Sequence, residues 1–284
     1  MYDVPWVCRC WVYRLPRDDA PRQHDPAGLT HETPPMTRRP PLPDVNFSDH
    51  GDVRYLHLGT PWVQGSMLID QPYDIHLDYV QRMMAWLLFV PLERVASLQA
   101  MQLGLGAGAL TKFCWKHVRM KTTAIELNPQ VIAACRLWFK LPPDSSRLSV
   151  VLGDAAEVVS HGHWRGQIDA LQVDLYDHEA AAPVLDSADF YAHCRQLLSE
   201  HGIMSVNLFG RSHRYPESLD KIVSAFGAKA VWVFKPTREG NTVVLALRTP
   251  VVPQRGALAA QAEAIQARWP LPAARWVRVL KPVA

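Results

Sequence analysis

Acidic residues gather at one point of the sequence, at the end of an apolar run and just after it. The run 168–175 includes Asp174, and Asp177 and Glu179 follow it, so three carboxylates fall within six residues. Carboxylates so close together repel one another, and a cationic ligand would relieve that repulsion. A carboxylate at the mouth of a site can also accept a proton from a reacting group. The segment therefore predicts a site for a cationic substrate, and a solvated acidic loop is the alternative.

A glycine-rich turn forms a second pattern. The apolar run 98–103 leads into Gly104-Leu105-Gly106-Ala107-Gly108, and Glu126 follows Gly104 by 22 positions. Glycines let the backbone turn sharply and approach a ligand closely, and an acidic residue at this spacing can accept hydrogen bonds from ribose hydroxyls. The alternatives are a plain tight turn and, for Glu126, a carboxylate at the start of the helix that follows Asn128. The nucleoside-site prediction names Gly104, Gly106, Ala107, Gly108 and Glu126.

Two further patterns carry weaker signals. Asp154 and Ala155 follow the apolar run 148–152, where Asp154 could accept a hydrogen bond from the exocyclic amine of a purine or cap a helix. His161-Gly162-His163 has the residue types of a metal pair but lacks a third ligand at a useful spacing. We therefore expect no metal site.

The hydrophobic pattern predicts a scaffold that brings these residues together. After residue 93, short apolar runs alternate with amphipathic segments, which is typical of right-handed crossovers and a mainly parallel sheet. Ligands bind beyond the carboxyl ends of such strands, where the residues above stand. The last two strands predict an antiparallel edge hairpin. The expected strands are 98–103, 122–127, 148–152, 168–175, 202–208, 229–234 and 242–247, and the expected helices are 109–118, 129–140, 154–160, 187–199 and 216–226.

The first 43 residues differ in composition from the rest. They contain nine of the 23 prolines, which are too many for a sustained helix or central strand, so we expect a disordered leader. Met36 is an alternative translation start. The expected organisation is a leader at 1–43, a small N-terminal β subdomain at 44–74 with strands 53–58 and 62–69, a helix within 75–92 that carries Tyr79, a nucleoside-binding domain at 93–250, and a C-terminal helix and tail at 251–284.

Composition excludes several classes of protein. The formal net charge of +3 on 284 residues does not indicate a nucleic-acid partner. The longest nearly apolar run, 83–92, is about half a membrane span, and the first thirty residues lack the pattern of a secretory signal. Five cysteines with irregular spacing are not a disulfide framework. We therefore expect a cytoplasmic protein with neither a nucleic-acid nor a membrane partner.

Five segments, in order, carry a resemblance to a known family. GLGAG at 104–108 stands where that family has GGGDG, IELNP at 125–129 is similar to its E-I-D-P, and GDA at 153–155 is similar to its G-D-G or G-D-A. Asp174 and Asp177 match the spacing of its D-S-x-D, and the stretch 189–204 is similar to its E-F-Y…C…L…G-I-M run. Together these segments resemble the spermidine synthase family of aminopropyltransferases. The resemblance implies a Rossmann-like class I methyltransferase fold, with a mainly parallel seven-stranded sheet preceded by a small β-hairpin subdomain.

The resemblance also implies roles for individual residues. The co-substrate would be decarboxylated S-adenosylmethionine, which gives its aminopropyl group to an amine such as putrescine. Asp174 would be the base and anchor for the attacking amine, Asp177 would bind the cationic acceptor, and Tyr79 could hydrogen-bond the amine. The family further implies a homodimer through the N-terminal β subdomain.

One departure from the family keeps other functions open. The family's GGGDG carries an Asp that holds the ammonium end of the aminopropyl group, and this chain has Ala107 there. Loss of one partner of a desolvated ion pair costs about 3–5 kcal/mol. A methyltransferase that uses intact S-adenosylmethionine and a non-catalytic nucleoside-binding relative are therefore alternatives to the aminopropyltransferase. The identity of the acceptor is not predicted.

Overall fold

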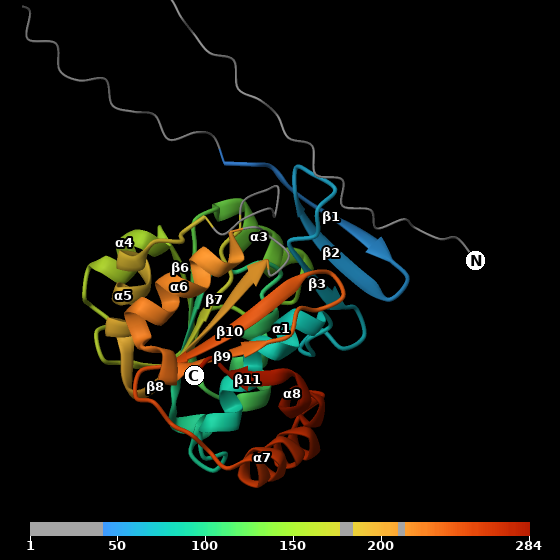
Figure 1. Cartoon of the computed structure of the whole chain (residues 1–284). Helices are drawn as coiled ribbons and strands as arrows, with labels where there is room; N and C mark the ends of the chain where they lie inside the picture. Colours follow the sequence, from blue (N-terminus) through green and yellow to red (C-terminus); the bar gives the residue numbers. More distant parts are fainter. Residues whose placement is uncertain (1–41, 177–183, 210–213) are drawn as a thin grey trace, which may run out of the picture. The chain divides into compact units, whose positions relative to one another are not determined.

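The computed structural model describes residues 42–176, 184–209 and 214–284 (Figure 1). Nearly all of the expected leader, including Met36, lies outside the described residues, as does Asp177, so the leader stays a prediction. The described residues form an α/β unit with a main sheet of eight strands and a separate sheet of three. The predicted fold class is confirmed.

The main sheet has the strand order β11-β9-β10-β8-β7-β4-β5-β6. Parallel pairing runs from β8 through β7, β4 and β5 to β6, and β10, β9 and β11 add to it in antiparallel fashion. The strands are β4 (Gln99–Leu103), β5 (Lys121–Glu126), β6 (Leu148–Leu152), β7 (Ile168–Val173), β8 (Leu198–Phe209), β9 (Val231–Phe234), β10 (Asn241–Leu247) and β11 (Leu280–Pro282).

The strand order places a crevice between β4 and β7. The chain runs from β4 outward through β5 and β6, and then returns as β7 on the other side of β4. The connection after β4 runs to one side of the sheet and the connection after β7 runs to the other. Diverging connections of this kind leave a space at the carboxyl ends of the two strands, where ligands bind in open α/β sheets. Both strands are almost wholly buried, as expected for apolar runs covered on both faces.

Helices cover both faces of the main sheet. On one face α4, α5 and α6 pack side by side, while α7 packs against the 3-10 segment Met84–Phe89 that follows α1 (Figure 1). Among the described residues, no helix is long and apolar enough to cross a membrane. The helices are α1 (Asp78–Met83), α2 (Ala109–Phe113), α3 (Pro129–Trp138), α4 (Ala155–Ser160), α5 (Ala188–Leu197), α6 (Tyr215–Phe226), α7 (Arg255–Arg268) and α8 (Ala273–Val279).

The small sheet packs against the glycine-rich turn. It consists of β1 (Val45–His50), β2 (Val53–Leu58) and β3 (Gly65–Leu68), all antiparallel. Its buried side chains Leu56 and Met67 share one apolar cluster with the turn residues Leu105 and Ala107 and with α3. The small sheet is therefore packed directly against the segment predicted to bind a nucleoside.

Several elements differ from the sequence expectation, among them a second C-terminal helix, α8, in the segment expected to be a tail. The main sheet has eight strands rather than seven, because the three-residue β11 pairs with β9 near the end of the chain. The small sheet has a third strand, β1, whose side chains are mostly exposed and show no apolar alternation. The helix expected from residue 75 begins at Asp78 and changes to a 3-10 helix at Met84.

Candidate active site

Gly104 and Asp174 meet where β4 and β7 end. Gly104 has a φ of +84°, and a Cβ there would stand 2.3 Å from the carbonyl oxygen of Asp174, so only glycine fits. The backbone N–H of Asp174 donates to the carbonyl of Leu103 at 3.0 Å. These two contacts fix the start of the acidic segment directly beside the glycine-rich turn.

Glu126 holds the glycine-rich turn in shape. Its Oε2 accepts a hydrogen bond from the backbone N–H of Leu105 at 2.9 Å, and its Oε1 accepts one from Asn128 at 2.8 Å. Burial raises the pKa of Glu126, and the backbone N–H groups act against that rise. A carboxylate has about four acceptor positions, so these two bonds leave room for a ligand. Glu126 therefore links the turn to the start of α3. The contact at the start of α3 agrees with the alternative expected for this carboxylate, and the contact with the turn was not expected.

Asp154 and Ala155 lie at the same edge of the sheet. Leu152 pairs with Glu126 across β6 and β5, and Asp154 follows two residues later. The Oδ1 of Asp154 accepts a hydrogen bond from the backbone N–H of Ala156 at 2.8 Å, so Asp154 caps α4. Capping uses one carboxylate oxygen and does not exclude the predicted purine contact.

Asp174 is held by two neutral donors. The hydroxyl of Tyr79 on α1 donates to its Oδ2 at 3.3 Å, and the side-chain nitrogen of Asn207 on β8 donates to its Oδ1 at 2.9 Å. Burial raises the pKa of Asp174 to about 6, against the effect of these two hydrogen bonds. The pairing of Tyr79 with Asp174 joins residues 95 positions apart, both predicted for the site.

Asn207 is a site residue that the sequence analysis missed. It lies near the carboxyl end of β8, the strand next to β7, and is 3% exposed. Its backbone carbonyl also accepts a hydrogen bond from the hydroxyl of Tyr176 at 3.1 Å. The available signal was a polar residue near the end of the mostly apolar run 202–208.

A shallow, open cleft lies between the glycine-rich turn, the small sheet and Asp174. Ala107, Tyr79 and Asp174 all line it, as predicted site residues should if they act together. Across the cleft the hydroxyl of Ser66 pairs with Nδ1 of His76 at 3.1 Å. Asp174 is the one carboxylate among the described residues that line the cleft.

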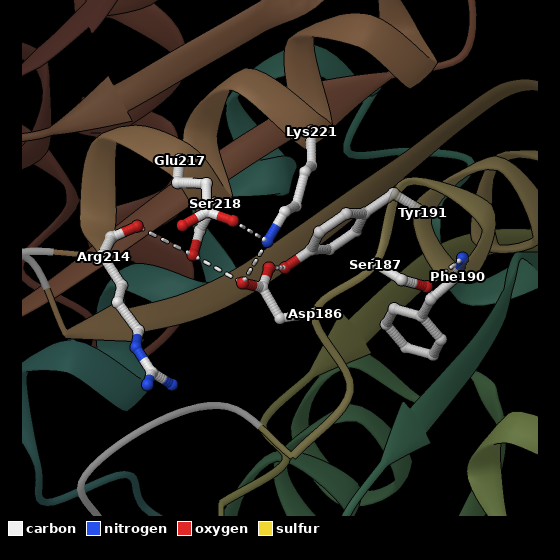
Figure 2. Close-up of polar contacts among 8 residues, drawn as sticks. All are labelled: Asp186, Ser187, Phe190, Tyr191, Arg214, Glu217, Ser218 and Lys221. Carbon is white, nitrogen blue, oxygen red and sulfur yellow. Dashed lines mark hydrogen bonds and ion pairs between the residues drawn. The ribbon is translucent and has the colours of Figure 1, made fainter.

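Asp186 ties together the helices beside the acidic segment. Its Oδ1 accepts a hydrogen bond from the hydroxyl of Tyr191 at 2.9 Å, and its Oδ2 accepts one from Ser218 at 2.8 Å and meets the ammonium of Lys221 at 3.2 Å (Figure 2). Tyr191 belongs to α5, and Ser218 and Lys221 belong to α6. The backbone N–H of Val184 donates to the carbonyl of Leu175, which ties the chain just before this cluster to the end of β7.

Two of the sequence expectations concern Asp177 and metal binding. Asp177 lies outside the described residues, so its role stays a prediction. Within the described ranges, no three His, Cys, Asp or Glu side chains are grouped so that they could hold a metal ion. The described part of the site therefore consists of a glycine-rich turn, a buried glutamate and a carboxylate with a raised pKa.

Comparisons with known proteins place this arrangement in context. No family model matches the chain. The polyamine aminopropyltransferase of Chromobacterium violaceum is 31% identical over 242 residues, which cover 84% of this chain and 90% of that protein. A probable spermidine synthase from Corynebacterium glutamicum superposes with a TM-score of 0.61 at 17% identity, over 77% of this chain and 83% of that one. Human methyltransferase-like protein 13, solved with SAH, superposes with a TM-score of 0.57 at 20% identity, over 74% and 95%.

The fold and the cleft define a class I methyltransferase-like α/β protein with a small N-terminal β sheet. The sequence relationship narrows that class, because it extends over most of both chains at more than 30% identity. The chain belongs to the polyamine aminopropyltransferase family.

Proposed function

We propose that the protein transfers an aminopropyl group from decarboxylated S-adenosylmethionine to a polyamine acceptor such as putrescine. The observation that carries the proposal is the position of Asp174, a carboxylate that lines the cleft beside the glycine-rich turn with Tyr79 bonded to it. Family membership supports the reaction type.

The nucleoside part of the donor would lie along the carboxyl ends of β4, β5 and β6. Gly104, Gly106 and Gly108 let the backbone approach it closely, and all three have positive φ angles. Glu126 would accept hydrogen bonds from the ribose hydroxyls. Asp154 and Ala155 would contact the purine. This order matches the sequence of the strands across the sheet.

The reaction needs a neutral amine and a place for its proton. The amine lone pair attacks the propyl carbon attached to the sulfonium, the C–S bond breaks, and its electrons leave with sulfur as a neutral thioether. An alkylamine with a pKa of about 10 arrives protonated, so a nearby carboxylate must accept a proton. Asp174, whose pKa is about 6, is suited to that role near neutral pH. Tyr79 would orient the amine, and Asp177 would bind the distant cationic end of the acceptor.

Ala107 supports a second candidate, a methyltransferase that uses intact S-adenosylmethionine. Ala107 lines the cleft and offers no carboxylate to the ammonium of an aminopropyl group. An uncharged residue there would also tolerate the carboxylate of the intact nucleoside. The two reactions share the fold, so only the transferred group separates them.

Product analysis tests both candidates. The purified full chain is incubated with each nucleoside in turn and a panel of amines, and the products are identified by mass. Aminopropyl transfer adds an aminopropyl group to the amine only with the decarboxylated donor, which is the expected result. Addition of a methyl group with the intact donor would establish the second candidate. If calorimetry shows nucleoside binding but neither product forms, the chain is a non-catalytic relative.

A further inference from the structure

Asn207 connects Asp174 to a strand that carries none of the predicted site residues. Its Nδ2 donates to Oδ1 of Asp174 at 2.9 Å, and its own Oδ1 accepts from Nδ2 of Asn241 at 3.1 Å. Asn207 is 3% exposed, so water cannot readily replace either bond. The three side chains form one row from the end of β7 through β8 to the start of β10.

The carboxylate of Asp174 determines which way the hydrogen bonds of this row point. An ionised carboxylate only accepts hydrogen bonds, so Asp174 requires the amide nitrogen of Asn207 and not its oxygen. The oxygen of Asn207 then faces Asn241, whose amide nitrogen satisfies it. A row in this orientation favours the ionised form of Asp174.

Asn241 is held in place by the hairpin between β9 and β10. Its backbone N–H donates to Oγ1 of Thr237 at 3.2 Å, and its carbonyl accepts from the N–H of Thr237 at 2.7 Å. Thr237 is itself buried. The antiparallel edge of the sheet therefore reaches the carboxylate in the cleft through two amide side chains.

We propose that Asn207 and Asn241 are positioning residues for aminopropyl transfer, which hold Asp174 ionised and occupy its Oδ1, so that Oδ2 beside Tyr79 receives the proton of the attacking amine. The proposal rests on the proposed function, since it assigns the oxygen that acts in that reaction. Neither asparagine is required to touch a substrate.

The groups around Asp174 allow the effect to be measured as a pH dependence. Among the described residues, the titratable groups near it are Tyr79 on α1, Tyr176 on the segment after β7, and His76, which lines the same cleft. Asn207 and Asn241 carry no charge. The bond from Asn207 opposes the burial that raises the pKa of Asp174 to about 6. Loss of this bond therefore raises that pKa further, and less of Asp174 is ionised near neutral pH.

The test replaces Asn241 rather than a residue of the cleft. In Asn241→Asp a second carboxylate competes for the single amide group of Asn207, which can no longer serve both. With a pKa moved up by about 1, we expect kcat to fall about tenfold below pH 6 and only about twofold at pH 7, with the acid limb of the kcat profile at higher pH and the KM values unchanged. Asn241→Leu should move the acid limb in the same direction by a smaller amount. Because the new carboxylate of Asn241→Asp also repels Asp174 directly, the uncharged Asn241→Leu decides whether the row acts through its hydrogen bonds, and an unmoved acid limb in that variant would overturn the proposal.

The next residue on the strand provides a matched control. Thr242 is 1% exposed, and its Oγ1 has no partner among the described residues, so Thr242→Val removes a buried hydroxyl without touching the row. The control should keep the wild-type kcat and pH profile. An unmoved acid limb in a folded Asn241→Asp protein would overturn the proposal, as would equal losses in Thr242→Val.

A second measurement separates this proposal from the proposed function. Absence of aminopropyl transfer by the wild type would refute the function, yet the carboxyl group of Asp174 can still be titrated by NMR in the free protein. Asn241→Asp should raise the pKa of Asp174 above its wild-type value by about 1. An unchanged pKa would show that the row does not control the ionisation of Asp174.

Discussion

Gly65 and Ala107 are in direct backbone contact. A Cβ on Gly65 would stand 2.6 Å from the backbone nitrogen of Ala107 and 2.8 Å from its Cβ. The contact joins β3 of the small sheet to the glycine-rich turn, and both residues line the cleft. The distance between the small sheet and the nucleoside-binding turn is therefore set by the absence of a side chain at position 65.

Gly65→Ala should force β3 and the turn apart. Overpacking of this kind lowers the free energy of unfolding by about 1–3 kcal/mol, and the displaced turn should bind the nucleoside donor more weakly. Thermal unfolding and calorimetry measure the two effects. Gly256→Ala is the control, because nothing lies within 4 Å of a Cβ at that helical position. Equal behaviour of the two variants would show that the contact does not constrain the turn.

Ala107→Asp should move donor preference towards decarboxylated S-adenosylmethionine. The new carboxylate would pair with the ammonium of that donor and repel the carboxylate of the intact one. We expect the ratio of the two affinities to change by at least about tenfold, since a hydrogen bond to a charged group contributes about 1.5–3 kcal/mol. Ala107→Asn introduces a side chain of about the same size as Asp but without its charge. A similar shift in that variant would contradict the electrostatic explanation.

Glu126→Ala should weaken both the nucleoside complex and the fold. Lost hydrogen bonds to ribose would reduce the binding free energy by about 1.5–3 kcal/mol. The backbone N–H groups of Leu105 and Asn128 would lose their acceptor, which should lower the free energy of unfolding by about 1–3 kcal/mol. Calorimetry and denaturant unfolding report the two effects, with the exposed Glu93→Ala as the control. Donor affinity equal to that of the wild type would remove Glu126 from the binding site.

Tyr191→Phe should destabilise the protein more than Lys221→Met. The buried hydroxyl of Tyr191 donates to the Asp186 carboxylate, a bond worth about 1.5–3 kcal/mol. Lys221 is partly exposed, and such an ion pair contributes about 0.2–1 kcal/mol. Denaturant unfolding gives both values. The reverse order would mean that the Asp186 cluster is held by the ion pair rather than by the buried hydroxyl.

The elements that position the site were predictable where burial leaves a pattern. The strand runs that end before Gly104 and Asp174 are apolar because helices cover both faces, and the turn glycines are required by positive φ angles. β1 gave no such signal, since nearly all its side chains face solvent. The bonds of Asn207 to Asp174 and Asn241 depend on the lateral order of β7, β8 and β10, and composition along one strand does not encode that order.

The raised pKa of Asp174 has opposite consequences for activity and stability. Activity should fall as the pH drops through about 6, because the protonated carboxyl cannot accept a proton. The native state keeps this proton at a pH where the unfolded chain, in which the carboxyl has its ordinary pKa of 3.8, has lost it. The contribution of this carboxyl group to the free energy of unfolding is therefore lost as the pH rises from about 4 to 6. Asp174→Asn should become progressively more stable than the wild type over that range, as measured by unfolding at each pH.

The rate of aminopropyl transfer by Asp174→Asn, compared with that of the wild type at saturating decarboxylated S-adenosylmethionine and putrescine, tests the central claim most directly. The substitution keeps the shape of the side chain and removes the proton acceptor. We expect the rate to fall about 10²–10⁴-fold, the span for loss of a general base, while donor binding and folding are retained. A variant that transfers the aminopropyl group at the wild-type rate would show that the carboxylate in this cleft is not the base.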